Sequence, residues 1–131
     1  MKEKLAECSF LIPTVRDSDR KPHPIETWWA FQEELRTAWP EGHTGPEWAY
    51  RDVRPISGEY RDSGTGRVVR DVSRRFTLAV PESRVGALRS ILADAARRFD
   101  QKAIYLSVAG VVEFVVPAGV GFHWPEQGGI L

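Results

Sequence analysis

The segment Ala103–Val116, AIYLSVAGVVEFVV, constrains the fold more than any other part of the chain. Its even positions carry apolar side chains at strict period two, with Gly110 in the middle. This alternation is typical of a β-strand, because successive side chains point to opposite faces. At about 3.3 Å per residue such a strand would span roughly 40 Å, whereas ordinary strands have about 5–6 residues. We therefore predict that the segment either bends at Gly110 or leaves its own sheet to meet a second subunit.

Length and composition indicate one soluble globular domain over residues 1–131. Hydrophobic residues make up 42% and charged residues 27% of the chain, which is ordinary for a folded domain. The formal net charge is zero, so nothing draws the whole molecule to nucleic acid or to an anionic membrane. No apolar run reaches the roughly 20 residues of a membrane helix, and the N-terminus lacks the apolar stretch of a signal peptide. We expect a cytoplasmic protein.

The single cysteine, Cys8, excludes an internal disulfide and fits a reducing compartment. It stands at the start of an apolar run, so we interpret it as a small buried residue and not as a reactive thiol.

Strand and helix patterns alternate along the chain. Residues 1–7 are polar and expected to fray, and residues 117–131 are rich in glycine and proline, which predicts an irregular tail. Helical spacing of apolar residues, with proline and acidic residues at each start, predicts two helices. The predicted elements are a strand at Cys8–Val15 ending near Pro13, a helix at Thr27–Trp39, a strand at Glu47–Ile56, a hairpin at 59–81 with its turn at 62–66, a helix from Pro81 to Phe99, and the long strand.

The order β-α-β-β-α-β is the ferredoxin-like arrangement, an α+β fold with an antiparallel sheet and two helices on one face. In this order the long strand is the last one and enters beside the first. Its inner half, Ile104–Val108, should face the helices. Its outer half should meet a second subunit or the folded-back tail, since an exposed apolar strand must be paired or covered. The candidate self-association residues are Val111, Val112, Phe114 and Val116, and we expect a homodimer.

The predicted hairpin is rich in arginine. Residues 51–75 contain seven arginines and four acidic residues, a local charge of +3. Arginine suits phosphate and carboxylate because its guanidinium donates bidentate hydrogen bonds. Arg54, Arg70, Arg74 and Arg75 are therefore candidate residues for an acidic ligand, another protein or, less favoured, nucleic acid. The alternative is a solvated sheet face with cross-strand ion pairs, to which Glu59 and Asp71 would contribute.

A small-molecule site is the second hypothesis. The chain contains five tryptophans, and a cavity between sheet and helices could be lined by Trp28, Trp29, Tyr105 and Phe114. His43, Arg54 and Glu113 would supply its polar groups. Glu113 is a carboxylate in an otherwise apolar strand, so it either has a buried partner or serves as an exposed gatekeeper against aggregation.

Motifs that would define an enzyme are absent from the sequence. No metal-ligand spacing, phosphate loop or nucleophile motif occurs, so we predict no catalytic residues, cofactor or metal. The preferred hypothesis is a self-associating interaction module, and the alternative is a ligand carrier or small-molecule enzyme.

Overall fold

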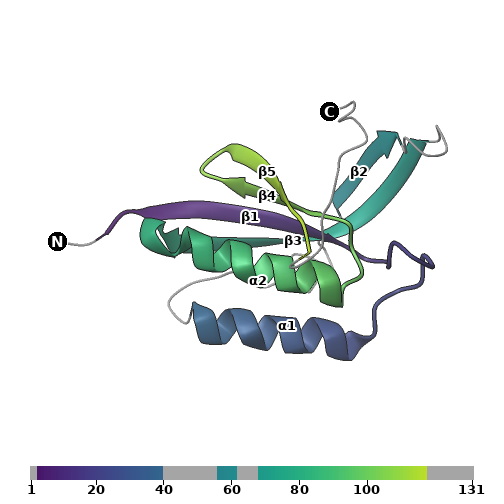
Figure 1. The fold of residues 1–131 in the computed structure, drawn as a ribbon, viewed down its shortest axis with the longest axis horizontal. Helices are drawn as coiled ribbons and strands as arrows, with labels where there is room; N and C mark the ends of the chain where they lie inside the picture. The colour runs from purple at the N-terminus through teal and green to yellow at the C-terminus, as the bar shows by residue number, and fades with distance from the viewer. Residues whose placement is uncertain (1–2, 40–55, 62–67, 118–131) are drawn as a thin grey trace.

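The computed structural model describes residues 3–39, 56–61 and 68–117. Their element order is β1 (Leu5–Pro13), α1 (Ile25–Ala38), β2 (Ile56–Arg61), β3 (Val68–Pro81), the 3₁₀ turn η2 (Glu82–Arg84), α2 (Val85–Arg98), β4 (Ile104–Val108) and β5 (Val111–Val115). The strands form one sheet in the order β2-β3-β1-β4-β5, and every neighbouring pair is antiparallel. Figure 1 shows both helices on the same side of this sheet. The predicted ferredoxin-like α+β fold is confirmed, with β5 added at one edge.

The core lies between the helices and the inner face of the sheet. Apolar residues at even positions of β1 and β3 alternate inward, and the apolar stripes of both helices meet them. Phe10 and Phe76 stack with their ring centroids 5.0 Å apart, and Phe31 meets both rings edge-on. Cys8 is fully buried, as predicted. The predicted helical stripes are confirmed, because Trp28, Phe31, Leu35, Val85, Leu88, Leu92, Ala95, Ala96 and Phe99 are all buried.

Several element boundaries differ from the prediction. Residues 5–7, expected to fray, begin β1, because their backbone pairs with residues 79–81 of β3. Helix α1 starts two residues earlier than predicted, directly after Pro24. Gly58, expected to interrupt a strand, pairs with Asp71 inside β2. Most of the predicted strand at Glu47–Ile56, the turn at 62–66 and the tail from residue 118 lie outside the described residues.

The long strand predicted at 103–116 is two strands. Ala109 and Gly110 both have positive φ angles, 49° and 88°, and together form a two-residue turn. Turns of this length need positive φ at both positions when their twist matches the flanking strands. β5 therefore folds back on β4, pairing Val108 with Val111 and Ile104 with Val115. The predicted bend at Gly110 and the place of Ile104–Val108 beside β1 are confirmed, whereas the predicted continuation past Gly110 beyond the sheet is wrong.

Strand β3 is long enough to serve two neighbours. Its first part, Val68–Ser73, pairs with β2, and its second part, Ser73–Pro81, pairs with β1. As a result β2 lies beyond the end of β1, and the β2–β3 hairpin rises away from the helix layer (Figure 1). Glu59 and Arg70 occupy directly opposite positions in the register of this hairpin.

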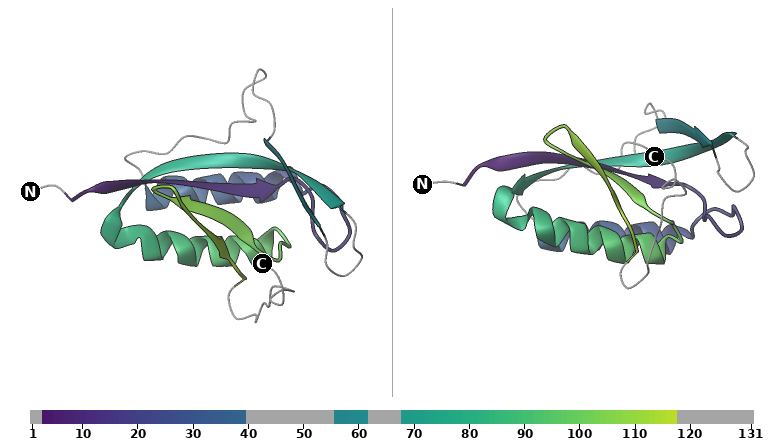
Figure 2. Two further views of the ribbon diagram at one scale, coloured as in Figure 1. Left: turned by 90° about the horizontal axis from the view of Figure 1, so that it is seen from above. Right: turned by 45° about the horizontal axis from the view of Figure 1, so that its top comes forward.

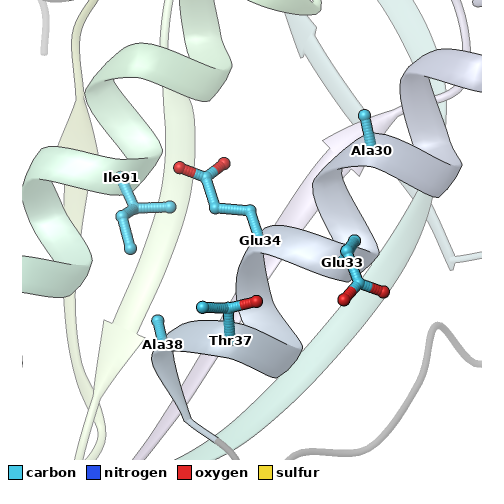
Figure 3. Close-up of a pocket in the computed structure, with 6 residues that line it drawn as sticks. All are labelled: Ala30, Glu33, Glu34, Thr37, Ala38 and Ile91. Carbon is cyan, nitrogen blue, oxygen red and sulfur yellow. The ribbon is translucent and has the colours of Figure 1, made fainter.

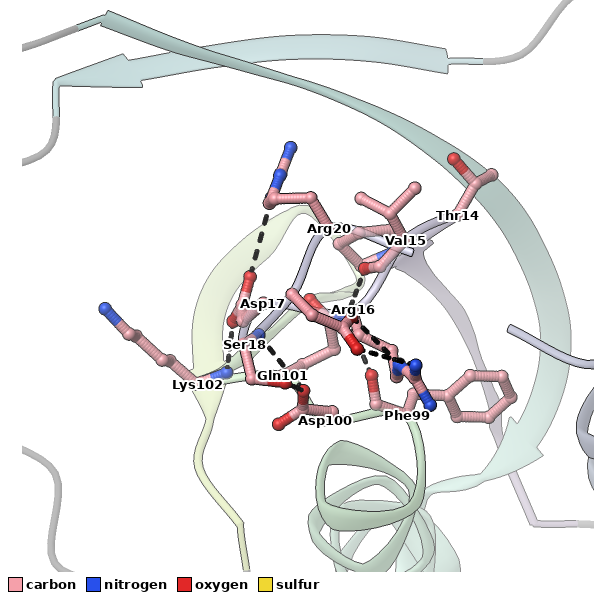
Figure 4. A network of polar contacts seen from close by, with 12 residues as sticks. Thr14, Val15, Arg16, Asp17, Ser18, Arg20, Phe99, Asp100, Gln101 and Lys102 are labelled. Atoms are coloured by element: carbon pink, nitrogen blue, oxygen red, sulfur yellow. Dashed lines mark hydrogen bonds and ion pairs between the residues drawn. The ribbon is translucent and has the colours of Figure 1, made fainter. Parts of the chain in front are cut away.

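The segment 14–24, between β1 and α1, is tied to the chain that joins α2 to β4. Asp17 accepts a hydrogen bond from the Lys102 backbone N–H, and the Asp100 carboxylate accepts from both the backbone N–H and the hydroxyl of Ser18 (Figure 4). The buried Gln101 donates from its Nε2 to the carbonyls of Val15 and Phe99, each at 2.8 Å. These bonds fix one end of the helix layer against the end of β1.

Candidate functional site

Three regions of the described structure have the chemistry of a possible site. The first is an aromatic cluster where β1 ends and α1 begins. His23 is buried, contacts Trp28 and Phe99 edge-on, and lies 2.9 Å from the Pro13 carbonyl through its Nε2. Arg74 lies over the Trp28 ring at 4.1 Å. The rings of this cluster pack against one another, and the Nε2 of His23 is engaged by the Pro13 carbonyl. The role of the cluster is therefore structural.

Arg74 accordingly has a different environment from the one predicted. It points to the helix side of β3, where burial lowers the pKa of Arg74 to about 10. A guanidinium with that pKa still carries its charge at neutral pH, and the Trp28 ring face compensates part of its lost hydration. The neighbouring Arg75 points to the other side of the sheet and is exposed. The two arginines therefore do not form one basic surface. Arg54 lies outside the described residues, and for Arg70 only the backbone position is described.

The buried imidazole makes stability depend on pH. Burial lowers the pKa of His23, the Pro13 carbonyl opposes this shift, and Arg16 and Arg74 add to it. The unfolded chain therefore binds a proton more readily than the folded one near pH 6. Stability from neutral His23 is complete above the ordinary histidine pKa of about 6.5 and declines as pH falls below it, by at most about 1.4 kcal/mol per pH unit.

We expect the free energy of unfolding, measured by urea titration, to decrease between pH 7.5 and about 5.5, and the variant His23→Gln to show a flatter profile. The glutamine amide can still donate to the Pro13 carbonyl but does not titrate. Equal slopes for the two proteins in this window would contradict the assignment.

The second region is an open groove of about 570 Å³ between α1 and α2. Figure 3 shows Glu34 reaching across it toward the helix that carries Ile91. Its carboxylates are engaged by the protein itself, since Glu34 pairs with Arg98 and Glu33 with Arg36. Salt bridges within a helix layer neutralise the charge that would attract a ligand. Trp29 lies elsewhere on α1 and is 60% exposed.

The third region is the outer face of the sheet, opposite the helices. Odd-numbered residues of β1, β3 and β4 point to this face, because their even-numbered neighbours are buried beneath. In β5, which lies beyond a turn, the even-numbered residues Val112 and Phe114 point to it. The strand register aligns them in two cross-strand rows. The rows are Arg75–Leu11–Tyr105–Phe114 and Thr77–Ser9–Ser107–Val112.

This outer face combines aromatic, hydroxyl and charged groups. Tyr105 and Phe114 are directly opposite each other, with ring centroids 5.9 Å apart in an edge-to-face arrangement, and are 36% and 49% exposed. The hydroxyl-rich row lies about 7 Å further along the strands, two residues at about 3.3 Å each. Arg75 stands at one end of the aromatic row. None of the described elements covers this face, and both helices lie on the other side in every view of Figures 1 and 2.

The predicted cavity lined by four aromatic residues does not exist among the described residues. Trp28 is in the core, Trp29 is on the outside of α1, and Tyr105 and Phe114 are on the outer sheet face. They cannot line one cavity because the sheet separates them. His43 lies outside the described residues.

Of the two alternatives for Glu113, a partner or an exposed gatekeeper, the structure shows a partner, which is an arginine. Glu113 points to the helix side of β5 and accepts two hydrogen bonds of 2.8 Å from Arg89 of α2. This bidentate contact lowers the pKa of the Glu113 carboxyl. The pair fastens β5 to α2, so Glu113 is neither a free gatekeeper nor part of the outer face.

Comparison with known proteins identifies the fold. No protein-family model and no curated protein matches the sequence. A phage SAM lyase in complex with S-methyl-5′-thioadenosine superposes with a TM-score of 0.61 at 12% identity, over 92% of this chain and 96% of that one. The chain shares its fold with this phage SAM lyase. The apo state of a phage SAM lyase superposes with a TM-score of 0.56 at 8% identity, over 91% of this chain and 94% of that one.

Sequence patterns did not single out the hydroxyl-rich row of the outer face. Ser9, Thr77 and Ser107 come from three strands that are far apart in the chain, and only the register aligns them. The alternation in β1, β3 and β4 does mark each one as facing away from the core, which is the available signal. Among the described residues no group of histidine, cysteine and carboxylate side chains could hold a metal, and none of the described helices is long and apolar enough to cross a membrane.

Proposed function

We propose that this protein binds a nucleoside-type small molecule on the outer face of its sheet. The class is that of S-methyl-5′-thioadenosine, the ligand of the phage SAM lyase that has the same fold. Fold alone does not carry function. The observation that carries the proposal is the aromatic row, in which Tyr105 and Phe114 present ring surface beside an arginine and a row of hydroxyls.

Each part of such a ligand meets a matching group on this face. A purine ring stacks on aromatic side chains with a gain of about 1–3 kcal/mol per base, which suits Tyr105 and Phe114. Ribose hydroxyls exchange hydrogen bonds with side-chain hydroxyls, and the row containing Ser9 and Ser107 supplies them within about 7 Å. Arg75 at one end of the aromatic row would bind a carboxylate, such as that of an amino-acid moiety, through its guanidinium.

Glu7 adds the opposite charge to the same face. It is exposed in β1, two residues before Ser9, and pairs in register with Ala79. A positively charged sulfonium or ammonium group of a ligand could therefore bind the Glu7 carboxylate, which is separated from Arg75 along the strands of the outer face. A ligand that carries both charges, as S-adenosylmethionine does, fits this distribution better than a polyanion. The proposal thus favours a small zwitterionic nucleoside over nucleic acid.

Isothermal titration calorimetry with S-methyl-5′-thioadenosine and with S-adenosylmethionine tests this proposal. Both should bind to the full chain, and Tyr105→Leu should weaken binding by about 5-fold to 100-fold, the equivalent of one lost stacking contact. Arg75→Ala should weaken only the ligand that carries a carboxylate. The matched controls Trp29→Leu and Arg97→Ala remove an exposed aromatic and an exposed arginine from the helix layer, and they should leave both affinities unchanged.

Absence of binding at millimolar ligand would overturn the proposal. Loss of affinity in Trp29→Leu but not in Tyr105→Leu would move the site to the helix layer. Mass spectrometry of S-adenosylmethionine after incubation separates a carrier, which leaves the molecule intact, from a lyase, which splits it.

A further inference from the structure

We propose that Ser9 and Ser107, here called the serine pair, recognise the two adjacent hydroxyls of a ribose. The outer face would then select ribonucleosides over deoxyribonucleosides. This inference rests on the proposed function and adds to it a preference within the nucleoside class. It is carried by the register of the two serines, by the state of their hydroxyls and by the charge next to them.

The register sets the two serines side by side on the outer face. Ser9 of β1 and Ser107 of β4 are direct partners. The Ala109 N–H donates to the Glu7 carbonyl at 2.9 Å, so Ala109 and Glu7 form a hydrogen-bonded pair. Such pairs alternate along an antiparallel ladder, which makes the serine pair, two positions further on, a hydrogen-bonded pair as well. Its Cα atoms are therefore about 5.5 Å apart, with both side chains on one face.

The hydroxyls of the serine pair are not used by the described part of the protein. Elsewhere the Ser18 hydroxyl donates to Asp100, and the Ser83 hydroxyl donates to Glu3. Neither hydroxyl of the serine pair makes a hydrogen bond to any residue that the structure describes. Both serines are half-buried, and a hydrogen bond is stronger in such a place than in open water. The pair therefore offers two adjacent hydroxyls to a ligand.

Neutral hydroxyls suit a diol better than an anion. A serine hydroxyl both donates and accepts, so each serine can exchange a hydrogen bond with one of two adjacent ligand hydroxyls. Phosphate and carboxylate bind more strongly to arginine, lysine and backbone N–H groups. An anion here would also be repelled by Glu7, which is exposed two residues before Ser9 and points to the same face. A 2′-deoxyribose has lost one of the two hydroxyls and would leave one serine without a partner.

The place of the serine pair relative to the aromatic row fits a nucleoside. Tyr105 precedes Ser107 by two residues in β4, so the two rows are about 7 Å apart along the strands. In a nucleoside the ribose is bonded directly to the base. A purine stacked on Tyr105 and Phe114 can thus extend its sugar over the serine pair without leaving the sheet face.

Calorimetric titration of the full chain with S-methyl-5′-thioadenosine and with its 2′-deoxy counterpart tests the preference. The wild type should bind the ribose form about 3-fold to 10-fold more tightly, the equivalent of one neutral hydrogen bond. The double variant Ser9→Ala/Ser107→Ala should bind both ligands with equal affinity. Ser9→Thr/Ser107→Thr keeps both hydroxyls and should keep the preference. The matched control Ser90→Ala removes an exposed serine from α2, on the other side of the sheet, and should also keep it.

Circular dichroism verifies that the double alanine variant retains the fold, and the single variant Ser107→Ala, which should reduce the preference, replaces it otherwise. Equal binding of the two ligands by the wild type would overturn this inference and leave the proposed function standing. A preference that persists in the alanine variants, or one that is lost in Ser90→Ala, would also overturn it. Absence of binding of either ligand would overturn the proposed function and this inference together.

Discussion

Replacing Phe10 with alanine is expected to lower the free energy of unfolding by about 3–5 kcal/mol, the largest effect of any change considered for this protein. Phe10 is fully buried at the middle of the central strand, stacked on Phe76 and edge-on to Phe31. Truncation removes the transfer energy of the ring, leaves a cavity between sheet and helices, and loses aromatic pair contacts of about 0.5–1.5 kcal/mol each. Strands on both sides of β1 limit how far the cavity can collapse.

The measurement is thermal and urea unfolding of the variant beside Leu5→Ala. At about 3–5 °C per kcal/mol for a domain of this size, the melting temperature should fall by about 10–20 °C. Leu5 is in the same strand but 62% exposed, so its replacement should change stability by less than about 0.5 kcal/mol. Similar losses for the two variants would show that the stacked phenylalanines are not the centre of the core.

Gln101→Leu is expected to cost about 2–4 kcal/mol, although it replaces a polar side chain with an apolar one in a buried position. The wild-type Nε2 donates to the carbonyls of Val15 and Phe99, one on the segment after β1 and one at the end of α2. Leucine satisfies neither carbonyl, and a buried acceptor without a partner costs about 1–3 kcal/mol. The change also releases the connection between the two elements.

Urea unfolding measures this cost, and amide hydrogen exchange locates it. Protection should fall first in residues 14–24, because they are fastened by Gln101, Asp17 and Asp100. Lys102→Ala is the matched control: its exposed side chain is lost while the backbone N–H that binds Asp17 is kept, so stability should stay within about 0.5 kcal/mol. Uniform loss of protection over the whole sheet would argue against a local fastening role.

The order of elements was predictable because it depends on local periodicity. The helical stripes around Phe31 and Leu92 and the alternation in β3 specify which side of each element is buried, and one core follows from them. The turn between β4 and β5 was harder to predict, because its first residue is Ala109 and a positive φ angle is uncommon for alanine. Gly110 was the one residue that indicated a bend at this point. Without the turn, Val111–Val116 reads as a continuation of the strand, which predicts a contact with a second subunit or with the folded-back tail.

The candidate site was less predictable because it depends on register. Period two places the adjacent residues Arg74 and Arg75 on opposite faces of β3, as predicted, but it does not indicate that Arg74 lies over Trp28. Glu113 met Arg89 across 24 residues, a pairing that no spacing rule indicates. Periodicity gives the face of a side chain, but it does not say which strand will be the neighbour.

The place of β1 at the centre of the sheet has a consequence during synthesis on the ribosome. β1 emerges before the other described elements, but its two neighbours are residues 73–81 and 105–108. Helix α1 can form early, whereas the sheet cannot close around β1 until β4 has left the exit tunnel. Pairings this distant in sequence are slow to form, and an unpaired apolar strand is prone to aggregate. Until the chain reaches residue 108, the Leu5–Pro13 segment therefore lacks at least one of the two strands that flank it in the folded sheet.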